Sequence, residues 1–221
     1  MSASAGDRTG SRAVLVTAFA VGVVSVLGLA APGTLPPADA TGADVVAWFR
    51  EHGDRVRWSV WAATLELPLL TLLVALLRRL LPPVYRDVFL VGGIAIVITA
   101  AVQAWFLGGL ALHAHQLDPA VARTALDVAI FFGPVLTGAT TTLMAPTTAL
   151  ALTRRAGFPR WLGVLGAIVI AEQLVETSTI FGSSGFLEPG GAMNMQLGAA
   201  LFVAWLTALS VWAGMRGRFT A

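Results

Sequence analysis

Three glutamates lie inside long apolar stretches of the sequence, where a carboxyl group is rare. They are Glu66, Glu172 and Glu176, and Asp127 is a fourth acid closer to the start of its own stretch. On insertion scales, a charged side chain at the centre of a bilayer costs about 2.5–3.5 kcal/mol, so such acids are candidate site residues. A protonated carboxyl group could act as a general acid, and a second carboxylate could serve as its counter-ion or base.

Glu172 and Glu176 are four residues apart, which places both side chains on one face of a helix, about 6 Å apart. Two carboxyl groups this close, without a nearby cation, favour a shared proton over two negative charges. No arginine lies within any of the apolar stretches. The alternative is structural, since carboxyl groups can also bond to neighbouring hydroxyls and tie helices together. Three acids in one chain favour a functional cavity over this alternative.

Counting residues from the ends of the apolar stretches places the acids at comparable depths. At 1.5 Å per residue, Glu66 lies about 12 Å below one surface and Glu176 about 9 Å below the same surface. We expect Asp127, Gln103, Asn194 and Gln196 near this layer. Aromatic rings nearby could stabilise developing positive charge, although tryptophans near helix ends also serve as interfacial anchors. The predicted substrate-binding residues are therefore Trp61, Gln103, Trp105, Phe106, Phe131 and Phe132.

The composition of the chain and the length of its apolar stretches predict the helices that position these residues. Of the 221 residues, 57% are hydrophobic and only 12% are charged, whereas soluble domains carry about a quarter charged residues. About 20 apolar residues are needed to cross the hydrocarbon layer. Six stretches meet this length, so the sequence predicts an all-α, polytopic bundle of about six transmembrane helices: 13–31, 58–77, 88–112, 125–152, 161–182 and 195–214.

The distribution of arginine predicts the orientation of the bundle, because short cytoplasmic loops retain positive charge. The loops and tails of one side hold ten arginines: Arg8, Arg12, Arg78, Arg79, Arg86, Arg154, Arg155, Arg160, Arg216 and Arg218. The other side holds four, interleaved with acids: Arg50, Arg55, Arg57 and Arg123. We therefore expect cytoplasmic termini, a short tail over residues 1–12, and a single transmembrane domain over 13–221 in the plasma membrane. The first span is too long for a signal-peptide core, so we expect it to be retained.

The external loop over residues 32–57 combines prolines with an amphipathic segment. Thr41 and Asp44 resemble a capping box, which predicts a short helix of about ten residues that Gly53 ends. Val45, Trp48 and Phe49 share one face of this helix. That face either lies on the outer leaflet or packs as a lid on the ends of the spans. On the next external loop, Asp118 and Pro119 are typical of a helix start, so the long fourth stretch is expected to begin outside the hydrocarbon.

Several classes of site are excluded by composition. The chain has no cysteine and only three histidines, which argues against thiolate chemistry and against metal sites, so we expect no metal and no cofactor. A net charge of +2 without a basic cluster gives no support for nucleic-acid binding. The expected partners are membrane lipids and an apolar small molecule, with oligomerisation left open.

Two resemblances bear on function. The segment from Val45 to His52, the approach through Arg57 and Trp58, and the closing Phe202, Trp205 and Ser210 resemble a broad group of small actinobacterial membrane proteins, which brings no known activity. The intramembrane Glu66 and the Glu172/Glu176 pair resemble, in kind, the acids of integral-membrane terpene cyclases. This resemblance implies acid-catalysed protonation of an olefin or epoxide, although the helix count of that family is higher.

Three functions remain compatible with the sequence. The first is acid-catalysed isomerisation or cyclisation of an apolar, isoprenoid-like substrate, with Glu66, Glu172, Glu176 and Asp127 as catalytic residues. The second is a proton-coupled carrier or exporter, in which the same acids bind substrate and protons in turn. The third is an accessory membrane protein whose buried acids only join helices. Whether the chain is an enzyme is left open by the sequence.

Overall fold

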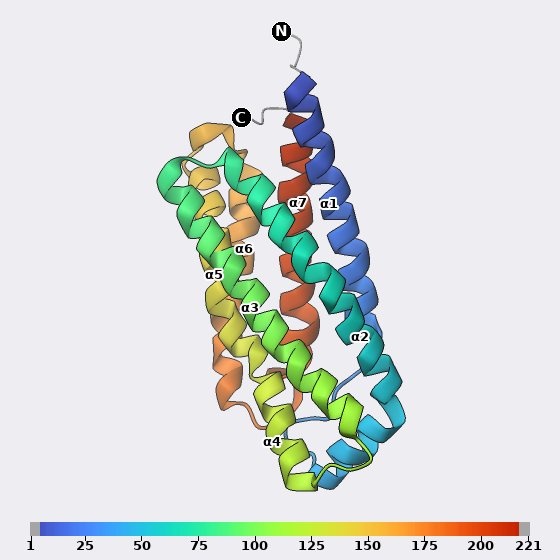
Figure 1. Ribbon diagram of the computed structural model, residues 1–221. Coiled ribbons are helices and arrows are strands. Elements are labelled where there is room, and N and C mark those ends of the chain that lie inside the picture. Colours follow the sequence, from blue (N-terminus) through green and yellow to red (C-terminus); the bar gives the residue numbers. More distant parts are fainter. Residues whose placement is uncertain (1–4, 217–221) are drawn as a thin grey trace.

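The computed structural model describes residues 5–216, apart from the side chains of residues 5–8, 29, 30 and 132. Seven α-helices and no strands occur in this range (Figure 1): α1 Ala5–Ala30, α2 Gly42–Leu77, α3 Pro83–His113, α4 Pro119–Ile130, α5 Phe132–Leu152, α6 Arg160–Glu176 and α7 Ala199–Arg216. Within these residues, six helical segments are long and apolar enough to cross a membrane. The predicted six-helix membrane bundle is therefore confirmed.

Both described ends of the chain lie at the same end of the bundle, as an even number of spans requires (Figure 1). We name this the termini end. The opposite end, named the loop end, holds the loop over residues 31–41, helix α4 and the segment over residues 182–192. That the termini end faces the cytoplasm stays a prediction from the arginine distribution.

The predicted short helix in the first external loop is instead the first part of α2. The capping box is confirmed, because the Asp44 backbone N–H donates to Thr41 Oγ1 at 3.2 Å and the Thr41 N–H donates to Asp44 Oδ2 at 2.9 Å. The prediction that Gly53 ends the helix is wrong. A glycine within a helix costs about 1 kcal/mol relative to alanine. Burial of apolar residues on both sides of Gly53 offsets that cost.

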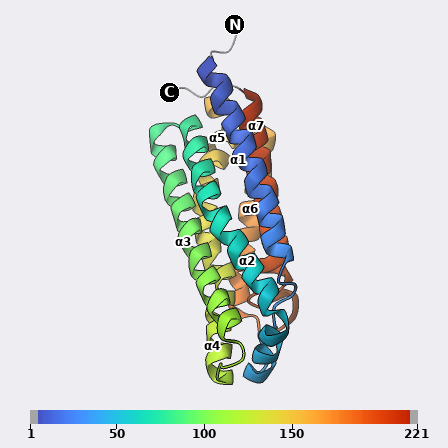
Figure 2. The same ribbon diagram turned by 45° about the vertical axis from the view of Figure 1, so that its right-hand side comes forward.

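The amphipathic face of this part of α2 packs against protein rather than on the lipid surface. Val45, Phe49 and Val56 are almost fully buried, in a cluster with Leu110 of α3 and Leu126 of α4. At 1.5 Å per residue, the 36 residues of α2 span about 54 Å, well beyond the hydrocarbon layer. The loop end is therefore a packed helical cap beyond the ends of the spans, at the bottom of the view in Figure 2.

The long fourth stretch divides into α4 and α5. Asp118 caps α4 as predicted, accepting hydrogen bonds from the N–H groups of Ala120 and Val121. The helix breaks at Phe131, three residues before Pro134, because proline has no N–H to donate to the carbonyl of Ile130. The break separates the cap helix α4 from the spanning helix α5.

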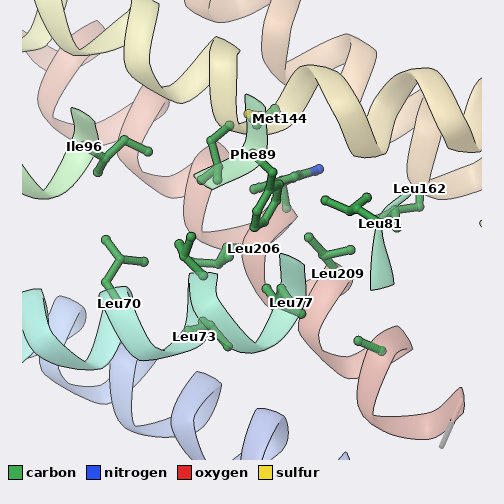
Figure 3. Close-up of a cluster of buried hydrophobic side chains, with 14 of the residues drawn as sticks. Leu70, Leu73, Leu77, Leu81, Phe89, Ile96, Met144, Leu162, Leu206 and Leu209 are labelled. Carbon is green, nitrogen blue, oxygen red and sulfur yellow. The ribbon is translucent and has the colours of Figure 1, made fainter. Parts of the chain in front are cut away.

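The termini end of the bundle is a tightly packed apolar core. Its buried members come from all the spanning helices and include Leu73 and Leu77 of α2, Phe89 of α3 and Leu209 of α7 (Figure 3). Towards the middle of the bundle the packing opens. There Leu70, Leu73, Ile96 and Leu206 form the floor of an internal cavity.

Candidate functional site

The central feature of the bundle is a cavity of about 230 Å³, bordered by α1, α2, α3, α5, α6 and α7. Most of its lining is aliphatic. Its polar lining residues are Ser25, Ser59, Glu66, Gln103, Thr140, Gln173, Glu176, Asn194, Thr207 and Ser210. Among the described residues, no arginine or histidine borders it. The cavity is thus apolar and acidic, without a cation of its own.

Glu176, the last residue of α6, is held by two amide side chains. Gln173 Nε2 donates to Glu176 Oε2 at 2.8 Å, and Asn194 Nδ2 donates to Glu176 Oε1 at 2.7 Å. The residue is only 4% exposed. A β-carbon added to Gly198 would lie 2.5 Å from Glu176 Oε2, so this glycine permits α7 to approach the carboxyl group. Glu176 therefore acts as the acceptor in a buried polar network.

Asn194 lies in a π-helical segment, Met193–Gly198, that leads into α7. Such segments are rare and occur frequently at functional sites. Besides Glu176, Asn194 Nδ2 donates to Thr179 Oγ1 at 3.2 Å. Its carbonyl oxygen Oδ1 is buried without a hydrogen-bond partner among the described residues. Asn194 also borders the cavity, so this unpaired acceptor lies within the cavity wall rather than on its accessible surface.

Gln173 connects the two predicted acids of α6. Its Nε2 also donates to Glu172 Oε2 at 3.0 Å, and its Oε1 accepts a hydrogen bond from Thr140 of α5. The predicted Glu172/Glu176 pair is therefore bridged by an amide rather than in direct contact. Glu172 itself is not among the cavity-lining residues, and its Oε1 is buried without a partner in the described part of the chain.

Gln173 and Thr140 were not among the site residues predicted from the sequence. A signal for Gln173 did exist, because it lies three residues before Glu176 and so shares its helix face.

Glu66 borders the cavity from α2. Ser25 of α1 donates to Glu66 Oε1 at 2.6 Å, which is the only hydrogen bond found for this carboxyl group among the described residues. Pro68, two residues later, lies inside α2 without ending it. Ser25 was not predicted from the sequence. The structure thus brings Glu66 and Glu176, which come from separate spans, to the border of one hollow.

Asp127 lies outside the cavity, contrary to its predicted place in the acidic layer. On α4 it pairs with Arg123, at 2.5 Å between Asp127 Oδ1 and Arg123 Nη2. Arg123 also donates to the carbonyl oxygens of Pro37 at 3.0 Å and Ala40 at 3.4 Å. Asp127 therefore pairs with Arg123, one helical turn earlier in the cap, and Arg123 in turn holds the loop over residues 31–41.

The predicted aromatic lining is also not brought to the cavity. Trp61 and Trp105 are 54% and 72% exposed, and Phe106 and Phe131 are each 37% exposed. These four rings lie on the outside of the bundle and are absent from the cavity lining, as expected of side chains that contact lipid. Phe132 begins α5, and its side chain lies outside the described residues. Gln103 does border the cavity and donates to the Ala129 carbonyl at 3.3 Å.

No metal site is formed by the described residues, since no group of three or more histidine, aspartate or glutamate side chains could hold an ion. Comparisons with known protein families, with characterised proteins and with solved structures each find no match to this chain. The function must therefore be argued from the cavity.

Proposed function

We propose that the protein binds an apolar molecule carrying a positively charged group, such as a lipid-soluble amine, and carries it in exchange for protons. One observation carries the proposal. The carboxyl groups of Glu66 and Glu176, on two different spans, border one apolar cavity that contains no arginine or histidine among its described lining residues. Because charge is costly in such surroundings, a cationic ligand supplies the counter-charge that the cavity lacks.

The arrangement of polar and apolar groups fits the two ends of such a ligand. An ammonium group offers only hydrogen-bond donors, which match the carboxylate oxygens of Glu66 and Glu176. Its alkyl chain matches the aliphatic floor formed by Leu70, Leu73 and Leu206 (Figure 3). A ligand with a carboxylate of its own would meet like charge at the same place and is disfavoured.

Exchange follows from the same carboxyl groups. Either a proton or an ammonium group neutralises them, so the two compete for one place in the cavity. Glu66 is the better exchange group, because among the described residues only Ser25 bonds to it. The amide bonds of Glu176 hold that side chain in position.

A binding experiment with three probes of equal chain length tests the selectivity. Octylamine, octanol and octanoate are added to the purified protein in lipid nanodiscs, and bound probe is quantified by mass spectrometry. We expect octylamine to bind about tenfold more tightly than octanol, and octanoate to bind most weakly. Equal binding of octanoate and octylamine would overturn the proposal.

Transport is tested with octyltrimethylammonium, which keeps its charge at every pH and so does not cross lipid as a neutral base. Proteoliposomes are loaded at acid pH inside and placed in neutral buffer containing the labelled cation. We expect uptake that stops when the pH gradient is collapsed and that is lost in Glu66→Gln. Uptake indifferent to the gradient would contradict proton exchange.

Acid catalysis on an isoprenoid-like substrate is a second candidate, favoured by one observation. Of the two Glu66 carboxyl oxygens, only Oε1 has a hydrogen bond among the described residues, and Leu67 and Leu70 border the same cavity. A carboxylic acid in this place would protonate an olefin or epoxide. Among the described lining residues Phe202 is the one aromatic side chain, and Trp61, Trp105, Phe106 and Phe131 lie outside the lining. A carbocation would therefore have little aromatic support, and we rank this function second. Incubation with an isoprenoid epoxide in D2O, followed by mass spectrometry for a deuterated isomer, tests it.

A further inference from the structure

The helices α1 and α7 run side by side, but their separation changes along the pair (Figure 1). Near the termini end they pack closely, since a β-carbon added to Gly214 would lie 2.4 Å from Leu15 Cγ. Nearer the middle of the bundle they do not. A β-carbon added to Gly22 of α1 would meet no atom within 4 Å.

A groove follows this opening on the outside of the bundle. It lies between α1 and α7 and is lined entirely by apolar residues and one threonine. Several of the side chains that border it are strongly exposed, including Phe19 at 75%, so they contact lipid in a membrane. The groove therefore opens to the bilayer.

The groove and the central cavity share lining residues. Ala18 and Gly22 of α1, and Val203 and Thr207 of α7, border both spaces. Ala18 and Gly22 are four residues apart, on one face of α1, and both are small. At this face, a single layer of small side chains on α1 therefore separates the cavity from the groove.

At the loop end, the buried residues Pro32 and Leu35 cover the cavity. The loop that carries them is held by hydrogen bonds on its C-terminal side. Ala38 N–H donates to Glu188 Oε2 at 2.9 Å, and Arg123 donates to the carbonyl oxygens of Pro37 and Ala40. A ligand arriving from water would have to break these bonds.

We infer that the seam between α1 and α7 at Gly22 is a lateral portal, through which the ligand passes between the bilayer and the central cavity. The inference rests on the proposed function. It adds the route by which the ligand enters the cavity and states that the ligand comes from the lipid phase. Behind the portal, the Glu66 carboxyl group borders the cavity and takes the charged end of the ligand, while the aliphatic groove holds the alkyl chain during passage.

The portal is tested by narrowing it without touching the polar groups. In the series Gly22→Ala, Gly22→Val and Gly22→Leu, the side chain grows into open space, so the fold is expected to persist. Gly138→Leu is the matched control, because Gly138 is also free of neighbours within 4 Å and lies on the exposed face of α5. Val203→Phe narrows the same seam from α7, should a change at Gly22 impair folding.

The readout is the rate at which bound and free ligand exchange. An octylamine with a terminal trifluoromethyl group is used as the probe, and 19F exchange NMR in nanodiscs gives both the dissociation rate and the affinity. We expect dissociation to slow with side-chain size, by about tenfold in Gly22→Leu, while Gly138→Leu exchanges at the wild-type rate. A leucine that merely filled the cavity would weaken binding and speed dissociation instead.

The possible outcomes separate the two proposals. Unchanged exchange in Gly22→Leu and Val203→Phe, with octylamine still bound, overturns the portal and leaves the proposed function standing. Faster exchange in these variants also overturns it. Failure of the wild-type protein to bind octylamine contradicts the proposed function, and the portal falls with it.

Discussion

Glu66 and Glu176 border the same cavity, yet their surroundings differ. Glu176 is the acceptor for two amide side chains and lies in a network that joins α5, α6 and the π-helical segment before α7. Glu66 accepts one hydrogen bond, from Ser25, in the described part of the chain. The comparison separates two roles for buried acids: Glu176 holds helices together and presents a fixed carboxyl group, whereas Glu66 is left free for a ligand or a proton.

The largest expected effect is on stability. Glu176→Leu leaves the amide N–H groups of Gln173 and Asn194 buried without their acceptor, and we expect a loss of about 2 kcal/mol. Glu66→Leu leaves only the Ser25 hydroxyl, which can turn to a backbone carbonyl of its own helix, so we expect a loss below about 0.5 kcal/mol. Unfolding in mixed micelles by titration with sodium dodecyl sulfate measures both. Equal losses of stability in the two variants would contradict the different roles assigned to Glu176 and Glu66.

The second effect is on ligand binding, and here the large effect is expected from the substitution of Glu66. Glu66→Gln keeps the shape of the side chain and removes its charge, so the affinity for octylamine is expected to fall about tenfold, which corresponds to about 1.4 kcal/mol. The midpoint of unfolding should stay close to that of the wild type. A stable variant with undiminished octylamine affinity would show that Glu66 does not contact the ligand.

A smaller effect concerns the bridge through Gln173. Thr140→Val removes one side of the hydrogen bond between α6 and α5 and should cost about 1 kcal/mol. Gln173→Leu removes the other side together with the donor to Glu172 and Glu176, and should cost more. Because the residues are partners, the double variant should lose clearly less than the sum of the two single losses. Strict additivity in the same unfolding titration would mean that the two side chains act independently.

The smallest effect is expected at Asp127. It lies in the cap with Arg123, so Asp127→Asn should leave the octylamine affinity within about twofold of the wild-type value. This variant also serves as the matched acid-to-amide control for Glu66→Gln. A loss of octylamine affinity as large as that in Glu66→Gln would show that Asp127 contributes to the binding site.

Local patterns in the sequence were sufficient to predict the spanning helices and two of the helix starts. The six apolar stretches, the Thr41–Asp44 capping box and the Asp118 cap each depend on neighbouring residues only, and each is confirmed. In contrast, the end predicted at Gly53 failed because burial of Val45, Phe49 and Val56 against other helices is not visible in the local pattern.

The rotation of each span about its axis could not be predicted. A helix that is apolar on all sides gives no amphipathic signal to say which face turns inward. The outward placement of Trp61 and Trp105 and the inward placement of Ser25 could therefore not be predicted. Asp127 was misplaced for a related reason, since its pairing with Arg123 competes with the depth that counting assigns to it.

The central claim is that the Glu66 and Glu176 carboxyl groups share one cavity that takes the charged end of an apolar cation. Dipolar recoupling NMR between 15N in octylamine and the side-chain carboxyl carbons of 13C-labelled glutamates in the membrane-embedded protein tests it most directly. The account predicts dephasing of the Glu66 and Glu176 carboxyl signals by the bound nitrogen, with the Glu66 contribution lost in Glu66→Gln. Dephasing of neither signal by tightly bound octylamine would contradict it.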